Sequence, residues 1–379
     1  MTNTTKYWIW LSLSIGTNNK KQKRVFETYD SIIDFYSGGI YEWRLSGIFS
    51  EKEINSLIST KLSDAQEVID KCKKLGFDII CFDDSNYPSK LLNIPDPPCV
   101  LYVWGKLPDV DHRLSIAMVG TRSATQYGVM TSHVLSASLS KLGVVVVSGG
   151  AQGIDTASHL GVLEASGATI CVLGCGIDYK YLMSNASLRK NISSTGAVIS
   201  EYPPGTKSYP SNFPVRNRII SGLSDGVIVV EADLKSGSLI TVNHALEQGR
   251  EVFAVMGNIN SRYSSGTNKM IKDGAIPVTS YMDVIEAFPQ YKIKSDDVNI
   301  ELSGQNNTEL NNAPVLHKDN LNLSQTVERI YRCIGNEPIH IDEIVAKTDL
   351  PVSKVLQSLT ELELLSLISC QQGRLYKLA

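Results

Sequence analysis

VVVVSGGAQGIDTASHLGVLEASGATICVLG, residues 144–174, holds one complete strand–turn–helix–strand unit. Its two ends, 144–148 and 169–174, are short apolar runs of the kind that form buried strands. Between them, residues 153–167 follow a glycine-rich turn and place apolar side chains at helical spacing. Because both runs are continuously apolar, we expect these strands to be covered on both faces, as strands in a parallel sheet are.

The same alternation of strands and helices extends from residue 114 to residue 280. The other apolar strand candidates are residues 114–119, 197–200, 227–232, 252–255 and 275–279. Most of the segments between them have helical spacing. This alternation predicts an α/β fold with a doubly wound, mostly parallel sheet.

The segments on either side of this pattern differ from it in character. Residues 1–75 are predicted to be a helical domain, and residues 76–290 to be the domain that holds the sheet. Residues 291–322 are polar and rich in Asn, Asp and Ser, which is typical of a flexible linker. Residues 323–379 have the pattern of three helices and a short hairpin, and so predict a winged-helix domain.

Composition limits the classes of protein that the chain can be. Its 379 residues suggest two or three domains, because a single core rarely grows beyond about 250–300 residues. The net charge of −3 provides no whole-protein field that attracts nucleic acid, so any polyanion site must be local. The seven cysteines form no CxxC pair, which indicates free thiols in a reducing compartment without a zinc site. No apolar run reaches the roughly 18–20 residues of a membrane span, and we expect a cytoplasmic protein with no membrane contact and no bound metal.

Three Gly- and Ser-rich turns, residues 119–123, 148–155 and 235–241, each connect a predicted strand to a predicted helix. Free backbone N–H groups and the positive end of the helix dipole favour anions at such turns. Each turn taken alone can equally be an ordinary strand–helix connection with a capping hydroxyl. All three should meet at the carboxyl edge of one sheet, where ligands of doubly wound folds bind. Their convergence predicts a ligand site.

The second turn resembles a phosphate-binding glycine loop, but it has neither the GxGxxG spacing of a dinucleotide site nor the GK[ST] of a P-loop. It therefore favours some phosphate group over a bound NAD or ATP cofactor. Asp155 and His159 lie four residues apart on the following helix, and pairing of Asp155 with its own turn is favoured over a catalytic pair. No arrangement of Ser, His and Asp or of paired carboxylates indicates hydrolysis, so no residue is assigned a catalytic role.

The segment 202–224 contains no Asp or Glu, although the whole chain is slightly acidic. It carries Lys207, Arg216 and Arg218 as cations and Phe213 as a possible stacking face for a base. We expect arginines in such a loop to contact phosphates, and the stacking of one base to contribute about 1–3 kcal/mol.

An alternative is that Phe213 belongs to the core and that Arg216 pairs with Glu201 or Glu231. Arg216 and Arg218 are two positions apart, so on a helix they would point in different directions. At most one of these two arginines is therefore expected to face a ligand directly.

Taken together, these motifs resemble the bacterial DNA-processing protein A family, also called Smf. The matching stretches are residues 87–107, 118–128, 148–178, 200–241 and 248–275. The resemblance covers about residues 85–290, and the flanking regions are similar to the family's N-terminal SAM-like domain and C-terminal winged-helix domain. It implies an extended Rossmann-like fold that binds single-stranded DNA and no nucleotide cofactor.

The resemblance also implies a set of contacts and partners. Motif matching assigns DNA contacts to turn, loop and helix residues of the central domain, namely Gly120, Thr121, Arg122, Ser148, Gly149, Gly150, Lys207, Phe213, Arg216, Asn217, Arg218, Ser236, Gly237, Ser238, Asn268 and Lys269. The implied function is protection of incoming single strands in natural transformation and loading of a RecA-type recombinase onto them, by a homodimer without catalytic turnover. Met256 departs from the family, which usually has Pro there.

Two other functions stay open. The first is a Rossmann-class enzyme that acts on a mononucleotide, with Glu201 or Glu231 as a catalytic residue. The second is a duplex-DNA regulator that reads DNA through its winged-helix domain. Its recognition helix would be residues 351–365, which carry Lys354 as their only basic residue and would read phosphates poorly.

Overall fold

The computed structural model describes residues 3–17, 20–291, 325–331, 333–335, 338–348, 350–364, 368–371 and 375–378. It divides into two compact units, residues 1–300 and residues 301–379. Apart from Tyr291, the predicted linker 291–322 lies outside the described residues. Among the described residues, none of the helices has the length and apolar character needed to cross a membrane.

Unit 1 begins with helices that bury aromatic side chains. They are α1 Thr5–Ile15, α2 Lys21–Thr28, α3 Ile32–Leu45, α4 Glu51–Ser59 and α5 Leu62–Leu75. Trp8 and Trp10 of α1 are almost completely buried, and the ring of Trp10 lies 5.5 Å from that of Trp43 in α3. α5 ends at Gly76, whose φ of 71° suits the left-handed position that closes a helix. The described part of residues 1–75 is thus mainly helical, as its spacing predicts.

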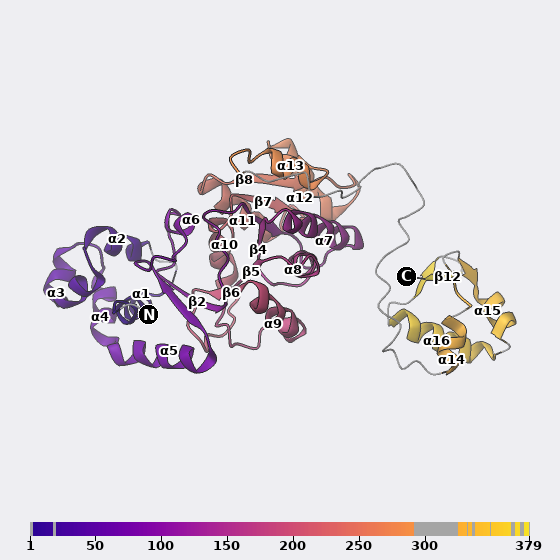
Figure 1. Cartoon of the computed structure of the whole chain (residues 1–379), viewed down its shortest axis with the longest axis horizontal. Coiled ribbons are helices and arrows are strands. Elements are labelled where there is room, and N and C mark those ends of the chain that lie inside the picture. The colour runs from indigo at the N-terminus through magenta and orange to yellow at the C-terminus, as the bar shows by residue number, and fades with distance from the viewer. Residues whose placement is uncertain are drawn as a thin grey trace. The chain divides into compact units, whose positions relative to one another are not determined.

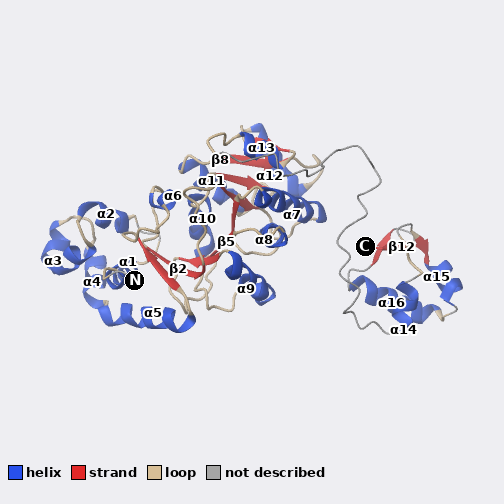
Figure 2. Ribbon diagram, viewed as in Figure 1, coloured by secondary structure: helices blue, strands red, loops and turns tan. Residues whose placement is uncertain are grey.

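A single large sheet follows these helices (Figures 1 and 2). Its strands are β1 Asp78–Cys81, β2 Val100–Gly105, β3 Ser115–Val119, β4 Val145–Ser148, β5 Thr169–Leu173, β6 Ala197–Ser200, β7 Gly226–Val229, β8 Glu251–Val255 and β9 Ile276–Val278. Their order is β1-β2-β6-β5-β4-β3-β7-β8-β9. The pairs β1–β2 and β2–β6 are antiparallel, and all other pairs are parallel. The predicted mostly parallel sheet is confirmed.

Helices cover both faces of the sheet. They are α6 Ser89–Leu92, α7 Gln126–Lys141, α8 Ile154–Glu164, α9 Ala186–Thr195, α10 Asn212–Gly222, α11 Ser238–Glu247, α12 Ser265–Lys272 and α13 Tyr281–Glu286, with the 3-10 turns Met183–Asn185 and Arg262–Ser264. Alternate side chains of β3 enter different cores: Ala117 and Val119 pack with α9 to α12, and Ile116 and Met118 pack with α7, α8 and α13. The doubly wound arrangement is therefore confirmed.

The N-terminal helices share the first of these cores, and Figure 1 draws them at the β1–β2 end of the sheet. Trp8 of α1 contacts Phe82, which follows β1, at a ring distance of 5.3 Å. The predicted boundary between residues 75 and 76 thus falls inside one compact unit, between α5 and β1.

The acid-free segment was predicted to be a loop, but its residues 212–222 form the helix α10. Pro214 is compatible with this helix since it lies in the first turn, where its missing N–H has no intrahelical acceptor. A helical backbone gives Arg216 and Arg218 fixed and different directions.

Unit 2 has the winged-helix fold that its sequence predicts. Its elements are α14 Gln325–Tyr331, β10 Ile339–His340, α15 Ile341–Thr348, α16 Val352–Leu364, β11 Ile368–Gln371 and β12 Leu375–Leu378. The strands form an antiparallel sheet in the order β10-β12-β11. Ile330 of α14, Ile344 of α15 and Val355 of α16 are completely buried in its core.

Candidate functional site

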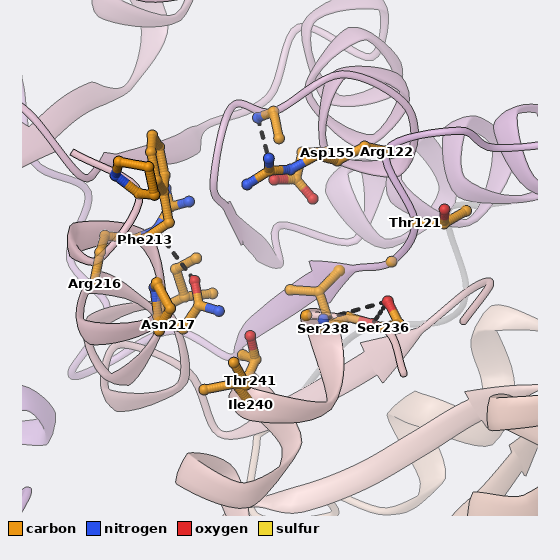
Figure 3. Close-up of a pocket in the computed structure, with 17 residues that line it drawn as sticks. Thr121, Arg122, Asp155, Phe213, Arg216, Asn217, Ser236, Ser238, Ile240 and Thr241 are labelled. Atoms are coloured by element: carbon orange, nitrogen blue, oxygen red, sulfur yellow. Dashed lines mark hydrogen bonds between the residues drawn. The ribbon is translucent and has the colours of Figure 1, made fainter. Parts of the chain in front are cut away.

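A pocket of about 530 Å³ opens at the carboxyl edge of the parallel strands (Figure 3). The chain runs from β3 outward to β6 in one direction and from β7 to β9 in the other, so β3 and β7 form the topological switch point of the sheet. The lining residues come from the end of β3 and the turn after it, from the turn after β4 and the start of α8, from α10 and the residue Pro210 before it, and from the turn before α11 with the first residues of α11: Val119, Gly120, Thr121, Arg122, Ala151, Asp155, Pro210, Phe213, Pro214, Arg216, Asn217, Ile220, Ser236, Gly237, Ser238, Ile240 and Thr241. The predicted convergence at this edge is thus present.

The turn after β3 approaches its neighbours so closely that only glycine fits at its start. A side-chain carbon at Gly120 would lie 2.9 Å from the carbonyl oxygen of Glu231 and 2.6 Å from Ile154 Cγ1. Thr121 N donates to the same carbonyl at 2.8 Å, which fixes the turn. Arg122 follows as an exposed side chain, with its guanidinium carbon 5.4 Å from the centroid of the Phe213 ring.

The turn after β4 contributes backbone and a carboxylate, whereas its predicted serine hydroxyl points elsewhere. Ser148 is completely buried, and its Oγ donates to Met118 O at 2.7 Å. Gly149 and Gly150 do not line the pocket themselves, although Gly149 O accepts a hydrogen bond from Arg216. Asp155 lines the pocket and accepts a 3.2 Å hydrogen bond from Ala151 N of its own turn, as the favoured interpretation of this residue predicts.

The turn before α11 places two hydroxyl groups at the side of the pocket facing α10 (Figure 3). Ser236 Oγ and Ser238 Oγ lie 2.8 Å apart, and α11 starts at Ser238. Gly237 between them also lines the pocket. The N-terminal end of α11 therefore adds the positive end of a helix dipole and two neutral hydroxyls to the site.

Arg216 is buried in the wall of the pocket without a carboxylate partner among the described residues. Only 4% of its surface is exposed. Its Nη1 donates to Gly149 O at 2.7 Å and to Val172 O, and its Nε donates to Asn217 Oδ1 at 3.2 Å. Burial lowers its pKa, which Asp155 partly offsets. Arg216 therefore carries a positive charge whose described hydrogen-bond acceptors are all neutral.

Arg218 lies away from the pocket and is fully engaged in ion pairs. Its Nη1 and Nη2 donate to the two carboxylate oxygens of Glu201, both at 2.8 Å, and its Nε lies 3.3 Å from Asp96 Oδ2. The Arg218 side chain is 1% exposed. The expected partner of Arg216, Glu201, is thus bound by Arg218, and Arg218 is not among the pocket residues because it leaves α10 about 200° from Arg216.

Phe213 occupies the mouth of the pocket among cationic and aromatic neighbours. The guanidinium carbons of Arg122 and Arg216 lie 5.4 and 5.8 Å from its ring centroid. Tyr181, which follows the end of β5, lies 5.1 Å from Phe213 at an interplanar angle of 40°. Sequence patterns pointed to neither Tyr181 nor the pocket position of Asp155. The only signal for Tyr181 was an aromatic residue in the connection after a predicted strand.

Three other predicted contacts lie outside the pocket lining. Lys207 is exposed in the connection between β6 and α10, three residues before the lining residue Pro210. Asn268 is held by two hydrogen bonds to the backbone of Gly257, at 3.2 and 3.0 Å. Lys269 pairs with Asp273 at 2.7 Å on the surface of α12. Neither Asn268 nor Lys269 therefore belongs to the lining of this pocket.

The acids that a mononucleotide enzyme would use are both engaged in structural bonds. Glu201 is the bidentate partner of Arg218, and Glu231 accepts hydrogen bonds from Thr125 N at 2.9 Å and Thr125 Oγ1 at 2.5 Å. Both carboxylates belong to residues that are 2% exposed. Neither is in the position of a free acid or base that faces the pocket.

The fold and the pocket define a class of protein: a Rossmann-like α/β protein with a pocket at the switch point of the sheet and with an appended winged-helix domain. Sequence comparison identifies the family within this class. The chain belongs to the DNA recombination-mediator protein A family, whose model matches residues 78–289. The DprA winged helix domain matches residues 318–374.

Individual relatives agree with this assignment. Protein Smf of Synechocystis is 37% identical over 315 residues, which are 78% of each chain. The crystal structure of DNA processing protein A from Streptococcus pneumoniae is 32% identical, with a TM-score of 0.64 over 76% of this chain and 98% of that chain. The structure of DNA processing protein A from Helicobacter pylori, studied for its single-stranded DNA binding mode, is 31% identical, with a TM-score of 0.51 over 56% of this chain and 96% of that chain.

Proposed function

We propose that the chain binds single-stranded DNA in the pocket between α10 and the three turns. The observation that carries this proposal is Arg216, a buried guanidinium that lines the pocket and whose hydrogen bonds within the described residues all go to neutral oxygens. Asp155 offsets the cost of this buried charge only in part, and an acceptor on a ligand would offset it further. A phosphate or a base carbonyl at the pocket mouth supplies such an acceptor, and charge-assisted hydrogen bonds of this kind are strong.

The exposed cations around the pocket suit the backbone of a nucleic acid strand. Arg122 borders the pocket, and Lys207 lies on the connection that leads into it. Phosphate contacts from such side chains do not depend on base sequence and weaken steeply as salt rises. A duplex would keep its bases stacked inside, whereas a single strand can place a base against Phe213. The local cation cluster in a slightly acidic chain therefore favours a single strand as the ligand.

We infer from family membership that the bound strand is passed to a recombinase. The family is that of a DNA recombination mediator, and a RecA-type recombinase is the enzyme class that acts on single strands in recombination. In this proposal the protein acts as a homodimer without catalytic turnover, and protects incoming strands during natural transformation. Sedimentation of the full chain tests the dimer. Assembly of a RecA-type filament on single strands coated with a binding protein, with and without the chain, tests the loading step.

Fluorescence anisotropy of labelled oligo-dT across a salt series tests the DNA site directly. We expect tight, salt-sensitive binding by the wild type and a loss of at least about tenfold in Arg122→Glu and in Lys207→Glu, since each replaces a phosphate contact by a repulsive charge. The slope of log affinity against log salt should fall by about 0.7 for each phosphate contact removed. Lys141→Glu is the matched control, because Lys141 ends α7 just before β4 begins and so lies near the opposite edge of the sheet.

Wild-type affinity in both charge reversals would contradict the proposed pocket. A thermal-shift comparison of oligo-dT with mononucleotides and NAD separates the alternative functions. Stabilisation by a mononucleotide and none by oligo-dT, in well-folded protein at low salt, would replace DNA binding by the enzyme hypothesis.

A further inference from the structure

Asp155 is a carboxylate in a pocket that is otherwise suited to anions. It lines the pocket, and it is 8% exposed. Figure 3 shows Asp155 near Arg122. A phosphate placed against this carboxylate would be repelled, so the part of the pocket that Asp155 faces is unsuited to the DNA backbone.

The acceptor capacity of Asp155 is largely unused by the protein. Among the described residues, Ala151 N donates a hydrogen bond to its Oδ2 at 3.2 Å. The Ser148 hydroxyl lies close enough to affect the pKa of Asp155, but its single proton is donated to Met118 O at 2.7 Å. Two carboxylate oxygens can together accept about four hydrogen bonds. A ligand with N–H groups would meet this capacity.

Arg216 and Asp155 converge on the same space beside Gly149. A side-chain carbon built on Gly149 would lie 2.7 Å from Asp155 Oδ2 and 2.8 Å from both Nη1 and Nη2 of Arg216. Glycine keeps this space open, which leaves a fixed donor and a fixed acceptor side by side at the pocket wall. A phosphate offers only acceptors and would not use the Asp155 carboxylate. The edge of a nucleobase, by contrast, can offer an N–H donor beside a carbonyl acceptor.

We propose that Asp155 is a specificity-determining residue that accepts a hydrogen bond from an N–H group on the edge of a base bound in this pocket. Arg216 donates to the neighbouring carbonyl of the same base edge, while Arg122 and Lys207 remain at the phosphates. Thymine offers such an edge with N3–H beside O4, and guanine offers one with N1–H and N2–H beside O6. This inference rests on the proposed binding of single-stranded DNA and assigns a base-reading role within it.

Substitution of Asp155 by Asn changes the character of the side chain with little change in its size. The Ala151 N–H requires an acceptor, so the amide oxygen of the substituted side chain would turn to Ala151, and its NH₂ group would face the pocket. The group presented to the ligand would then change from an acceptor to a donor. Asp155→Asn is therefore a sharper test than truncation, which would also make room for water.

The experiment compares oligo-dT with an oligomer of N3-methylthymine of equal length, by anisotropy, in wild type and in Asp155→Asn. The methyl group removes the N3–H donor and leaves the phosphates and the stacking face in place. We expect the wild type to bind oligo-dT about tenfold or more tightly than the methylated oligomer. In Asp155→Asn this ratio should fall towards one, with an unfolding temperature that shows an intact fold.

Each other outcome overturns a stated part of the proposal. Equal wild-type affinity for the two oligomers would remove the base-reading role and leave DNA binding intact. A ratio that persists in Asp155→Asn would mean that the methyl group is excluded by its bulk alone. Equal tightening of both oligomers by Asp155→Asn would mean that the carboxylate merely repels the backbone. Failure of the wild type to bind either oligomer would instead refute the proposed function, and this inference with it.

Discussion

On one face of α10, Arg218 donates two 2.8 Å hydrogen bonds to Glu201 and lies 3.3 Å from a carboxylate oxygen of Asp96. On the other face, two residues earlier, Arg216 is equally buried, but its described acceptors are the neutral oxygens of Gly149, Val172 and Asn217. The paired arginine has an ion partner inside the protein. Arg216 lines a pocket and has its charge offset only in part by Asp155, so a further acceptor is expected to come from a ligand.

The difference shows how burial alone misleads as a guide to function. Both arginines are less than 5% exposed, and both come from the same acid-free segment. What separates them is the identity of the acceptors within reach of each guanidinium. A buried cation with its own carboxylate stabilises the fold, whereas one without a carboxylate is a candidate ligand contact.

The largest effect should come from breaking the ion pair between Arg218 and Glu201. Arg218→Met leaves the Glu201 carboxylate buried and uncompensated, and we expect a loss of about 3–5 kcal/mol in the free energy of unfolding. Urea unfolding followed by circular dichroism measures this loss. The double variant Arg218→Met with Glu201→Leu should recover most of the stability, because it removes both charges. An Arg218→Met protein as stable as the wild type would show that this ion pair does not hold α10 in place.

Arg216→Met should separate binding from stability. We expect affinity for oligo-dT to fall by about 1.5–3 kcal/mol, or roughly 10- to 100-fold, through loss of a charge-assisted hydrogen bond to the ligand. The unfolding free energy should change less than in Arg218→Met, since the loss of bonds to two carbonyls is offset by removal of an unpaired buried charge. Anisotropy with oligo-dT and urea unfolding, each measured on Arg216→Met and Arg218→Met, test whether Arg216 serves binding and Arg218 serves stability. The reverse ranking, with binding lost only in Arg218→Met, would exchange the roles assigned here.

Phe213→Ala tests whether the aromatic ring that lines the pocket contacts a base. If the ring stacks on a base, affinity for oligo-dT should fall by about 1–3 kcal/mol with little change in its salt dependence, because no phosphate contact is removed. Phe213→Tyr is the matched control, since it keeps the aromatic face. Equal affinity of the Ala variant and the wild type would assign Phe213 to packing against Tyr181 and the two arginines alone.

At neutral pH the smallest effect concerns His159, which is completely buried and is affected by the charge of Arg216. Burial is the larger cause, followed by Arg216, and together they lower the pKa of His159 from 6.5 to about 3. The unfolded chain therefore binds a proton that the folded chain does not at pH values between about 3 and 6.5, so stability is lost as pH falls through this window.

The expected loss from His159 approaches about 1.4 kcal/mol per pH unit within that window. Urea unfolding at a series of pH values, in the wild type and in His159→Asn, isolates this contribution. Arg216→Met should weaken the pH dependence by raising the pKa of His159, whereas Arg218→Met should leave it unchanged. A wild-type pH dependence that His159→Asn does not alter would rule out this origin.

Much of the architecture could be predicted because strands and helices differ in the local pattern of apolar residues. The run at 144–148 is apolar at every position before its serine, and the strand β4 occupies Val145–Ser148. The acid-free segment was predicted to be a loop, whereas its residues 212–222 form a helix. Pro214 does not prevent this helix, because a proline is compatible with the first turn of a helix.

The candidate site could be predicted only in part, because local sequence patterns do not determine the contacts between remote segments. The order of motifs along the chain indicated that three turns meet at one sheet edge, and the pocket lies there. It did not indicate that the Ser148 hydroxyl would bond to Met118 O, or that Asn268 would be held by the backbone of Gly257. These outcomes depend on distances between segments that are remote in sequence.

By itself, the sequence determined the mostly parallel sheet with helices on both faces, the helical N-terminal region, the winged-helix domain and the edge at which the turns gather. Each of these follows from local periodicity and from the rule that the carboxyl ends of parallel strands meet at one edge. Only the tertiary structure decided which arginine of α10 faces the pocket and which one pairs with Glu201. The physical reason is that the role of a buried charge depends on the acceptors around it in space. For Arg216 and Arg218, most of those acceptors lie on segments far from α10 in the chain.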